Sequence, residues 1–433
     1  MILKEIKHIN YIVFPLIISR FCSFLFIFID QWLGTIISQD GYIAISVAGQ
    51  VSYIVIGTFG AIAIPLNILG SSYLQQGKTR EYETLFNTSF FLTNIIGLSL
   101  VFIFFIFSEH IFKIFFKIEP EILRLTVIYF KVITIEIWIT MCLFIYSSFF
   151  KVQEKTKIIM VGVFINNVVN ISISATLVLG LFGFPKLGVL GAGIGTVTGG
   201  GVNLLLYYLY FKRKAFFKLK NSFNYEVSIK ILKKYIPILT QDFIEDGLLT
   251  LILTYILAYI NPYLLGEFNL LGTISNFLLI GTYSYAIIST NLIIKNSTSI
   301  YKKLIPLLSS LSMTVVFLIF TSILLLSKNY IFKLYTTQTW VIDSIFPVFF
   351  INTIFIFPNI FLEIYKYALN GLNRETFIIK TLFIQKSLIL LTIYLFKPQN
   401  LKTLIIIVGC FQLTLALTYI FAYYRNISLH SVE

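Results

Sequence analysis

Long apolar runs separated by short polar segments make up most of this sequence. Residues 90–107 and 304–326 are two examples, and each is close to the ~20 residues with which a helix crosses a bilayer. The runs predict twelve membrane-spanning helices, at residues 10–33, 43–67, 86–108, 123–149, 157–182, 187–211, 231–259, 262–290, 303–327, 341–369, 375–396 and 403–424. We therefore expect an all-α integral membrane protein.

The composition supports this interpretation. Hydrophobic residues make up 58% of the chain and charged residues 12%, against about 25% charged in an average soluble domain. Cys22, Cys142 and Cys410 all fall inside predicted spans, where cysteines act as small apolar residues and not as a disulfide framework. The cysteines and histidines lack the spacing of a metal site. We expect no cofactor.

The net charge of +14 is unevenly distributed. Basic residues gather in alternate connections, above all in Lys212, Arg213, Lys214, Lys218, Lys220, Lys230, Lys233 and Lys234. By the positive-inside rule this asymmetry places both termini in the cytoplasm, in a multi-pass protein of the plasma membrane. The charge then reflects topology and contact with membrane lipid, not binding of nucleic acid.

The basic segment also divides the chain. We expect an N-lobe of six spans at residues 1–215, a cytoplasmic linker at 216–230 and a C-lobe of six spans at 231–433. Residues 153–156 (QEKT) resemble residues 373–376 (NRET), 220 positions later, and Pro15 and Pro237 are 222 positions apart. The pattern predicts two pseudo-symmetric six-helix lobes, an arrangement that suits alternating access by rocking.

A few acids lie where hydrocarbon is expected. Asp30 comes about twenty residues into the first span, so we interpret it as a carboxylate that binds a proton or Na⁺. The alternative is the wet end of a short helix. Span five offers polar partners, with Asn170 and Ser174 four apart on one helical face.

Span seven carries a second candidate. Asp242 and Glu245 are three residues apart and would repel each other if both were ionised, which favours a shared proton. The alternative is that Glu245 is an interfacial carboxylate flanked by Asp242 and Asp246. Pro15 and Pro237 lie within spans, where a proline removes a backbone hydrogen bond and allows bending. Bending of span one would couple ion binding at Asp30 to reshaping of a cavity.

Other charged groups receive simpler interpretations. Glu363 and Lys366 predict a structural ion pair across one helical turn. Lys131 and Glu136 are five residues apart and need not meet, so we assign them no role. Arg20 either extends to the headgroups or binds substrate. The glycines between residues 188 and 201 predict close packing of span six against a neighbouring helix.

Several of these motifs together resemble the multidrug and toxic compound extrusion (MATE) family, within the superfamily that includes polysaccharide flippases. They are Pro15 with Asp30, residues 57–60 (GTFG) with 75–77 (QQG), Asn170 with residues 187–196 (LGVLGAGIGT), Pro237 with Glu245, and residues 369–376 (LNGLNRET). The resemblance implies a cation or proton site at Asp30, near Asn170, Thr196 and the Ala192 carbonyl.

Two positions depart from the family pattern. Ser174 stands where many members have an aspartate, and Asn359 stands where some have a carboxylate in span ten. These departures favour proton coupling through Asp30, although Na⁺ at Asp30 stays open.

The resemblance implies a transporter, not an enzyme. We expect a monomer that exports organic, cationic or amphipathic small molecules in exchange for H⁺ or Na⁺. The main alternative is a flippase for a lipid-linked oligosaccharide, for which Arg20, Lys131 and Lys386 leave room. A membrane-embedded transferase would need a cluster of catalytic residues in its loops, and a receptor would append a soluble module; the sequence shows neither.

Overall fold

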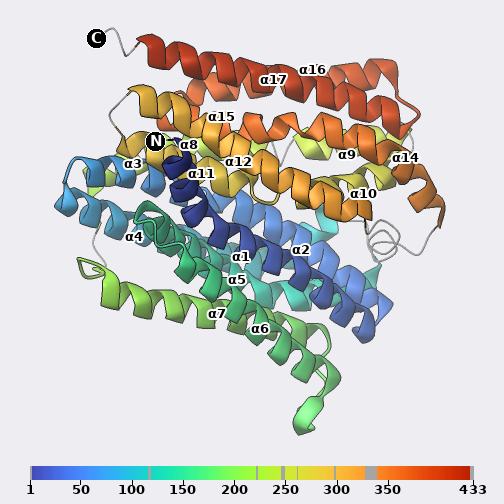
Figure 1. Cartoon of the computed structure of the whole chain (residues 1–433). Coiled ribbons are helices and arrows are strands. Elements are labelled where there is room, and N and C mark those ends of the chain that lie inside the picture. The colour runs from blue at the N-terminus through green and yellow to red at the C-terminus, as the bar shows by residue number, and fades with distance from the viewer. Residues whose placement is uncertain are drawn as a thin grey trace. The chain divides into compact units, whose positions relative to one another are not determined.

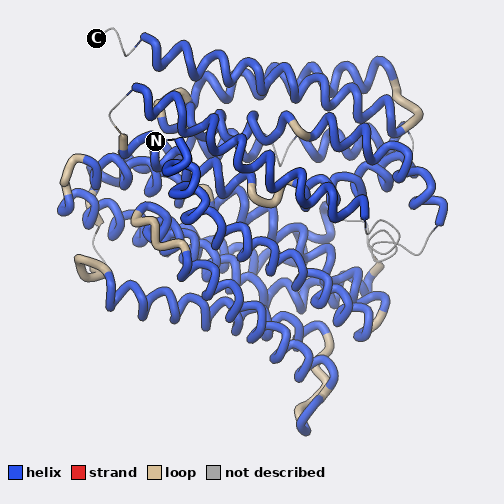
Figure 2. The backbone as a smooth tube through the Cα atoms, in the orientation of Figure 1, coloured by secondary structure: helices blue, strands red, loops and turns tan. Residues whose placement is uncertain are grey.

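The structure is a computed structural model that describes residues 2–115, 119–220, 223–244, 249–260, 262–296, 299–326 and 339–429. Within these ranges it does not describe the side chains of residues 26–32, 35, 115, 249–251, 254, 258, 262–267, 269–270, 299, 339–346 and 428–429. All regular elements in the described ranges are helices joined by short connections (Figure 1, Figure 2). The predicted all-α class is confirmed.

The first half of the chain forms α1 (Ile2–Ile37), α2 (Gln39–Gly60), α3 (Ala63–Gln75), α4 (Thr79–Phe115), α5 (Pro120–Val152), α6 (Lys157–Leu179), a 3-10 turn η1 (Leu181–Gly183) and α7 (Val189–Lys214). The second half forms α8 (Tyr225–Asp242), α9 (Leu249–Ile260), α10 (Pro262–Leu278), α11 (Thr282–Lys295), α12 (Ser299–Leu326), α14 (Thr339–Ile356), α15 (Pro358–Gly371), α16 (Glu375–Phe396) and α17 (Leu401–Leu429).

Within the described residues, eleven helical stretches are long and apolar enough to cross a membrane. They correspond to eleven of the twelve predicted spans. The remaining prediction, 231–259, covers α8 and α9, and residues 245–248 between them lie outside the described part. Large apolar side chains such as Phe102, 67% exposed, and Leu417, 57% exposed, point away from the protein interior. Such surfaces suit lipid, not water.

Corresponding helices of the two halves are broken at the same point. α2 gives way to α3 at residues 61–62, and α10 gives way to α11 at residues 279–281. Two backbone hydrogen bonds mark each break. In the first half the N–H groups of Ile62 and Ile64 donate to the carbonyls of Phe59 and Ala61. In the second half, 218 residues later, those of Ile280 and Thr282 donate to Phe277 and Leu279. The halves therefore share detailed backbone structure.

The turns after α5 and α15 repeat in the same way. Glu154 and Asn373 both have left-handed backbone angles, with φ of 60° and 61°. The N–H groups of Gln153, Glu154 and Lys155 donate to the carbonyls of Phe149, Lys151 and Phe150, and 219 residues later those of Leu372, Asn373 and Arg374 donate to Ala368, Asn370 and Leu369. The repeat predicted from residues 153–156 and 373–376 is thus confirmed, with an offset of 219 in place of 220.

The chain forms two compact units. One comprises residues 18–239, and the other comprises residues 1–17 with 240–433. Both divisions fall inside a helix, α1 and α8, and each comes two residues after a proline, Pro15 and Pro237. The start of α1 packs in the second unit, where the Tyr285 hydroxyl donates to the Asn10 side-chain oxygen at 2.6 Å.

Aromatic rings hold one end of the unit 18–239 together. Phe211 of α7 lies 5.0 Å from Phe86 of α4 and 4.9 Å from Phe149 of α5, measured between ring centroids. Phe217, in the segment after α7, joins the same group at 5.5 Å from Phe211. The start of α4 and the ends of α5 and α7 therefore lie at one end of the unit.

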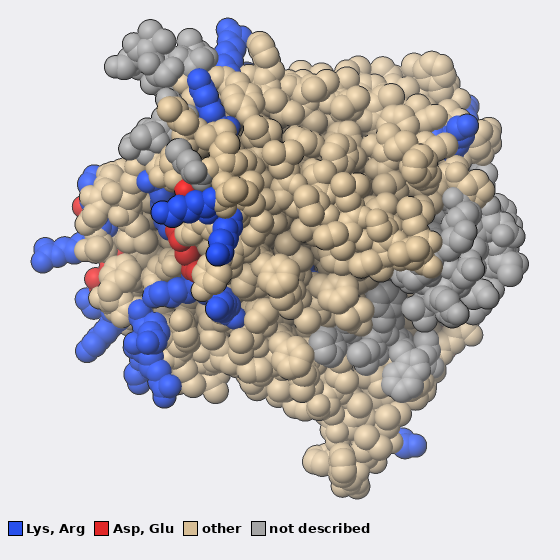
Figure 3. All heavy atoms as spheres, viewed as in Figure 1, with Lys and Arg blue, Asp and Glu red and all other residues tan. Residues whose placement is uncertain are grey.

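Basic residues of this unit gather at that end: Lys78, Arg80, Lys151, Lys155, Lys157, Lys212, Arg213, Lys214, Lys218 and Lys220. Figure 3 shows Lys and Arg side chains gathered on the left of the view, the side on which Figure 1 draws the end where α3 leads into α4. Burial lowers the pKa of Lys155, and the nearby charge of Lys214 lowers it further. The end is dense in positive charge.

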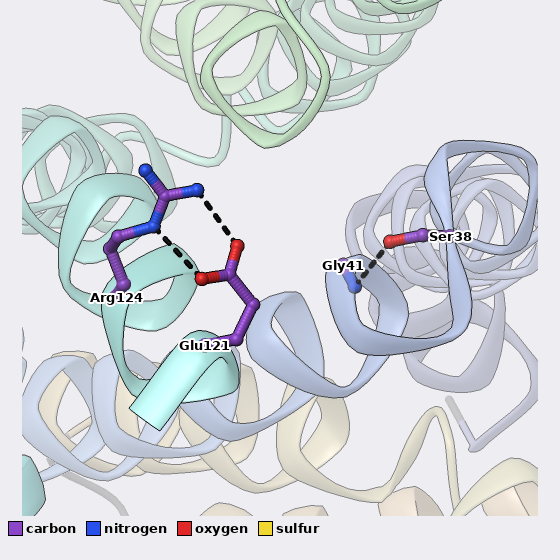
Figure 4. A network of polar contacts seen from close by, with 4 residues as sticks. All are labelled: Ser38, Gly41, Glu121 and Arg124. Atoms are coloured by element: carbon purple, nitrogen blue, oxygen red, sulfur yellow. Dashed lines mark hydrogen bonds and ion pairs between the residues drawn. The ribbon is translucent and has the colours of Figure 1, made fainter. Parts of the chain in front are cut away.

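The opposite end of the unit is built differently. The Ser38 hydroxyl accepts the N–H of Gly41 at 2.9 Å and caps α2 (Figure 4). At the start of α5, Arg124 donates two hydrogen bonds to Glu121, at 2.7 and 3.1 Å (Figure 4). The basic residues described at this end are Lys113, Arg124 and Lys186. The unit therefore has the charge asymmetry of a positive-inside protein.

Candidate functional site

Glycines let α6 and α7 approach each other closely. A Cβ at Gly191 would lie 2.8 Å from Leu177 Cβ, and a Cβ at Gly199 would lie 2.6 Å from the Asn166 carbonyl oxygen. At Gly195 the nearest atom would be Ser174 Oγ, only 2.1 Å away. Side chains do not fit at these distances, so the helices meet backbone to backbone. The close packing predicted for span six is present.

The same contact brings four predicted site residues together. The Ser174 hydroxyl lies 3.0 Å from Asn170 Oδ1 and 3.3 Å from the Ala192 carbonyl oxygen, within donating distance of both. Thr196 donates to the same carbonyl at 3.1 Å. Asn170 is 9% exposed and Ser174 is 2% exposed. The result is a cluster of four neutral oxygens, buried at Asn170 and Ser174 and half-buried at Ala192 and Thr196, which we call the α6–α7 cluster.

Two of the predicted acids cannot be placed in a site. Residue 30 belongs to α1, but the side chain of Asp30 is outside the described part, and Glu245 lies wholly outside it. One contact locates the end of α1: a Cβ at Gly188, directly before α7, would lie 3.6 Å from the Ile37 side chain. The end of α1 therefore lies beside the start of α7.

The second unit holds its own polar group. The side-chain amides of Gln241 and Asn370 exchange two hydrogen bonds, at 3.2 and 3.3 Å. Asp242 follows as the last residue of α8. Asn359 lies at the start of α15, one turn before Glu363, and is half-buried.

The predicted ion pair of α15 is confirmed. Lys366 Nζ lies 2.8 Å from Glu363 Oε1, and the lysine side chain is 7% exposed. A buried lysine needs such a partner because an unpaired charge would be costly there. Lys366 also lies over the ring of Tyr367, with Nζ 5.7 Å from the centroid.

Several polar contacts were not predicted. Asn67 donates to the Ser148 hydroxyl at 2.8 Å, and the Trp138 indole donates to Asn94 at 3.0 Å. The Gln241–Asn370 pair is a third example. The sequence did show that these polar residues lie inside apolar spans and would need hydrogen-bond partners. The partner of each is far away in the sequence, so only the fold identifies it.

Comparisons with known proteins fit this architecture. The MatE family model matches residues 15–176. "Probable multidrug resistance protein YoeA" from Bacillus subtilis (strain 168) is 24% identical over 187 residues, which cover 43% of this chain and only 39% of that protein.

Solved structures match over a much longer region. A MATE transporter solved in complex with MaL6 has a TM-score of 0.89 at 13% identity, covering 99% of this chain and 98% of that one. A MOP superfamily transporter from Pyrococcus furiosus has a TM-score of 0.88 at 13% identity, covering 98% and 96%. At this identity such likeness establishes the fold. The resemblance to the MATE family is therefore confirmed, by the family's own model over residues 15–176 and by the family's fold along almost the whole chain.

Proposed function

We propose that the chain is a secondary active transporter, which exports organic cationic or amphipathic compounds in exchange for H⁺ or Na⁺. The observation that carries the proposal is the α6–α7 cluster. Neutral oxygens buried in a membrane protein favour an ion pathway. Four such oxygens come from Asn170, Ser174, Ala192 and Thr196. Each lies 3.0 to 3.3 Å from the next one in the chain of hydrogen bonds.

The backbone register supports a role for Asp30 beside this cluster. Asp30 comes two turns before Ile37 in α1, a distance of about 10 Å along the axis. Ile37 lies beside Gly188, and α1 ends where α7 begins. Two turns into α7 lies Thr196, so the Asp30 backbone is level with the cluster. A carboxylate at this level would complete a site for a proton or Na⁺.

Coupling then follows from charge. A proton or Na⁺ bound to Asp30 cancels the negative charge of its carboxylate. A transported cation is then no longer attracted to Asp30 and is released. Pro15 and Pro237 lie where α1 and α8 pass from one compact unit into the other. Bending at these prolines would let the units move during alternating access. The basic end of the unit 18–239 would face the cytoplasm, in the plasma membrane.

Transport in membrane vesicles tests this proposal. A fluorescent organic cation is added outside inside-out vesicles that contain the protein, under an imposed pH gradient or, separately, a Na⁺ gradient. We expect uptake into the vesicles under the pH gradient. Asp30→Asn should insert normally and reduce uptake to the level of empty vesicles.

The matched control is Asp40→Asn, because Asp40 is an exposed acid in the first turn of α2. This variant should transport as the unchanged protein does. Uptake at the normal rate by Asp30→Asn would remove Asp30 from the mechanism. No uptake by the unchanged protein under either gradient would contradict ion-coupled export itself.

A further inference from the structure

Glu136 is an acid at the middle of a membrane-spanning helix. α5 runs Pro120–Val152, so sixteen residues separate Glu136 from each end, about 24 Å at 1.5 Å per residue. The hydrocarbon core of a bilayer is ~30 Å thick. Because Glu136 lies midway along a helix that is longer than this core, we expect its carboxyl group inside the hydrocarbon region, where its surroundings decide its charge.

Glu136 lies on the face of α5 that packs against α7. Val132 and Ile139, about one turn before and after it, both touch α7: a Cβ at Gly193 would lie 3.1 Å from Val132, and a Cβ at Gly200 would lie 3.2 Å from Ile139. Residues 132, 136 and 139 share one helical face. Glu136 is thus level with residue 196, the threonine of the α6–α7 cluster.

α2 contributes a hydroxyl at the same level. Ala48 packs with Phe130 and Ile133 of α5, and Gly60 lies against the ring of Phe144, so Ser52 falls level with Glu136. Ser52 is 5% exposed, and its hydroxyl has no hydrogen-bond partner among the described residues. A buried hydroxyl without a partner is costly unless something binds it.

Among the side chains that the structure describes, Glu136 has a hydrogen bond but no counter-charge. The Thr140 hydroxyl donates to Glu136 Oε1 at 2.9 Å. Lys131, the nearest cation in the sequence, lies over the ring of Phe105, 5.5 Å from its centroid.

None of the other ionisable groups described on α5 and on the helices packed against it forms a hydrogen bond or an ion pair with Glu136. They are Asp40, Tyr42, Tyr53, Tyr73, Arg80, Glu81, Tyr82, Glu83, Glu109, His110, Lys113, Glu121, Arg124, Tyr129, Cys142, Tyr146, Lys151, Lys157, Tyr207, Tyr208, Tyr210, Lys212, Arg213 and Lys214.

We infer that Glu136 is a second exchange site, which trades a bound proton for the positive charge of the transported compound. An unpaired carboxylate at this depth is strongly disfavoured, so the empty site holds a neutral acid. An organic cation that binds beside it stabilises the carboxylate, and the proton leaves to water. One positive charge replaces another. The half-buried side chain leaves room for this approach.

The inference rests on the proposed function and adds an acid distinct from Asp30. Proton release on binding tests it with purified protein. Tetraphenylphosphonium is added to the whole chain in weakly buffered detergent solution, and a pH indicator counts the protons released. Glu136→Gln should release about one proton fewer per chain than the unchanged protein, and Glu136→Asp, which keeps the carboxyl, should restore the release.

The matched control is Glu121→Gln, on the same helix but exposed and paired with Arg124. It should release as many protons as the unchanged protein. Equal release by Glu136→Gln would overturn the inference and leave the role of Asp30 intact. Failure of the unchanged protein to export any cation in vesicles would instead contradict the proposed function.

A second measurement needs no variant. An apolar carbodiimide modifies protonated carboxyls in apolar surroundings, and mass spectrometry of peptides from the unchanged protein locates the label. We expect labelling at Glu136 but not at Glu121, and slower labelling of Glu136 when tetraphenylphosphonium is present. An unlabelled Glu136 would show that the acid is not protonated in the empty protein, which would overturn the inference.

Discussion

Gly195 has no room for a side chain. Beyond Ser174 Oγ, a Cβ there would lie 2.8 Å from the backbone oxygen of Asn170 and from the backbone nitrogen of Ser174. A serine side chain can rotate, but backbone atoms move only if α6 and α7 separate. The identity of residue 195 therefore determines how closely the cluster oxygens are held.

Gly195→Ala should destabilise the protein by about 1–3 kcal/mol, the usual cost of overpacking. Gly201→Ala is the matched control on the same helix, since a Cβ at Gly201 would meet nothing within 4 Å. Its effect should stay within about 0.5 kcal/mol. Thermal unfolding of both variants in detergent compares them. Equal melting temperatures would mean that the helices are not held together at Gly195.

At this scale the sequence predicted part of the site. Asn170 and Ser174 are four residues apart, so one helical face was enough to pair them. Ala192 and Thr196 came from the resemblance, and the structure brings all four together. Glu136 received no role because its importance depends on what surrounds it. The distant pairing of Gln241 with Asn370 depends on the fold in the same way.

The helices themselves were predicted better than their breaks. Residues 43–67 were expected as one span, yet the helix breaks between Gly60 and Ala63. Pro65 gives a physical reason, because it lacks the N–H that would donate to the Ala61 carbonyl and its ring crowds that oxygen. The matching break before α11 has Gly281 and no proline. One backbone feature thus arises from two different sequence signals, which explains why the pattern alone missed it.

The aromatic group at the basic end ties three helices to the segment after α7. Phe211 is 1% exposed, and Phe217 continues the packing into residues 215–220. There the Lys220 N–H donates to Asn87 Oδ1 at 3.0 Å, and Lys220 Nζ lies 3.4 Å from Glu83. The segment is therefore bound to α4 by packing, a hydrogen bond and an ion pair.

Phe211→Ala should cost about 3–5 kcal/mol, as for other buried phenylalanines, and should loosen this segment. Trypsin should then cut faster between Lys212 and Lys220, as measured by the appearance of two half-chain fragments. Phe102→Ala is the control, because Phe102 is 67% exposed on α4. Unchanged cleavage in Phe211→Ala would mean that the ion pair and hydrogen bond of Lys220 hold the segment without the rings.

At the scale of the whole molecule, the two halves repeat their backbone but not their chemistry. The turns at Glu154 and Asn373 have corresponding hydrogen bonds and similar φ angles. The α6–α7 cluster has no counterpart in α16, where positions 389 and 393, each 219 residues after Asn170 and Ser174, are isoleucines. In α15, Glu363 and Lys366 neutralise each other instead. The two halves thus share a backbone fold, and the four-oxygen cluster belongs to the first half.

The orientation of the molecule can be tested through its loops. Lys186, between η1 and α7, and Gln76, at the end of α3, are both exposed and lie at opposite ends of the unit 18–239. With Cys22, Cys142 and Cys410 replaced by serine, Lys186→Cys and Gln76→Cys each leave a single thiol. A membrane-impermeant maleimide added to intact cells should label the first and not the second, because the proposed orientation places the basic end in the cytoplasm. Permeabilised cells should show both labelled, which controls for access to the thiol. The reverse pattern would place the basic end outside. That result would contradict the orientation inferred from the charge asymmetry.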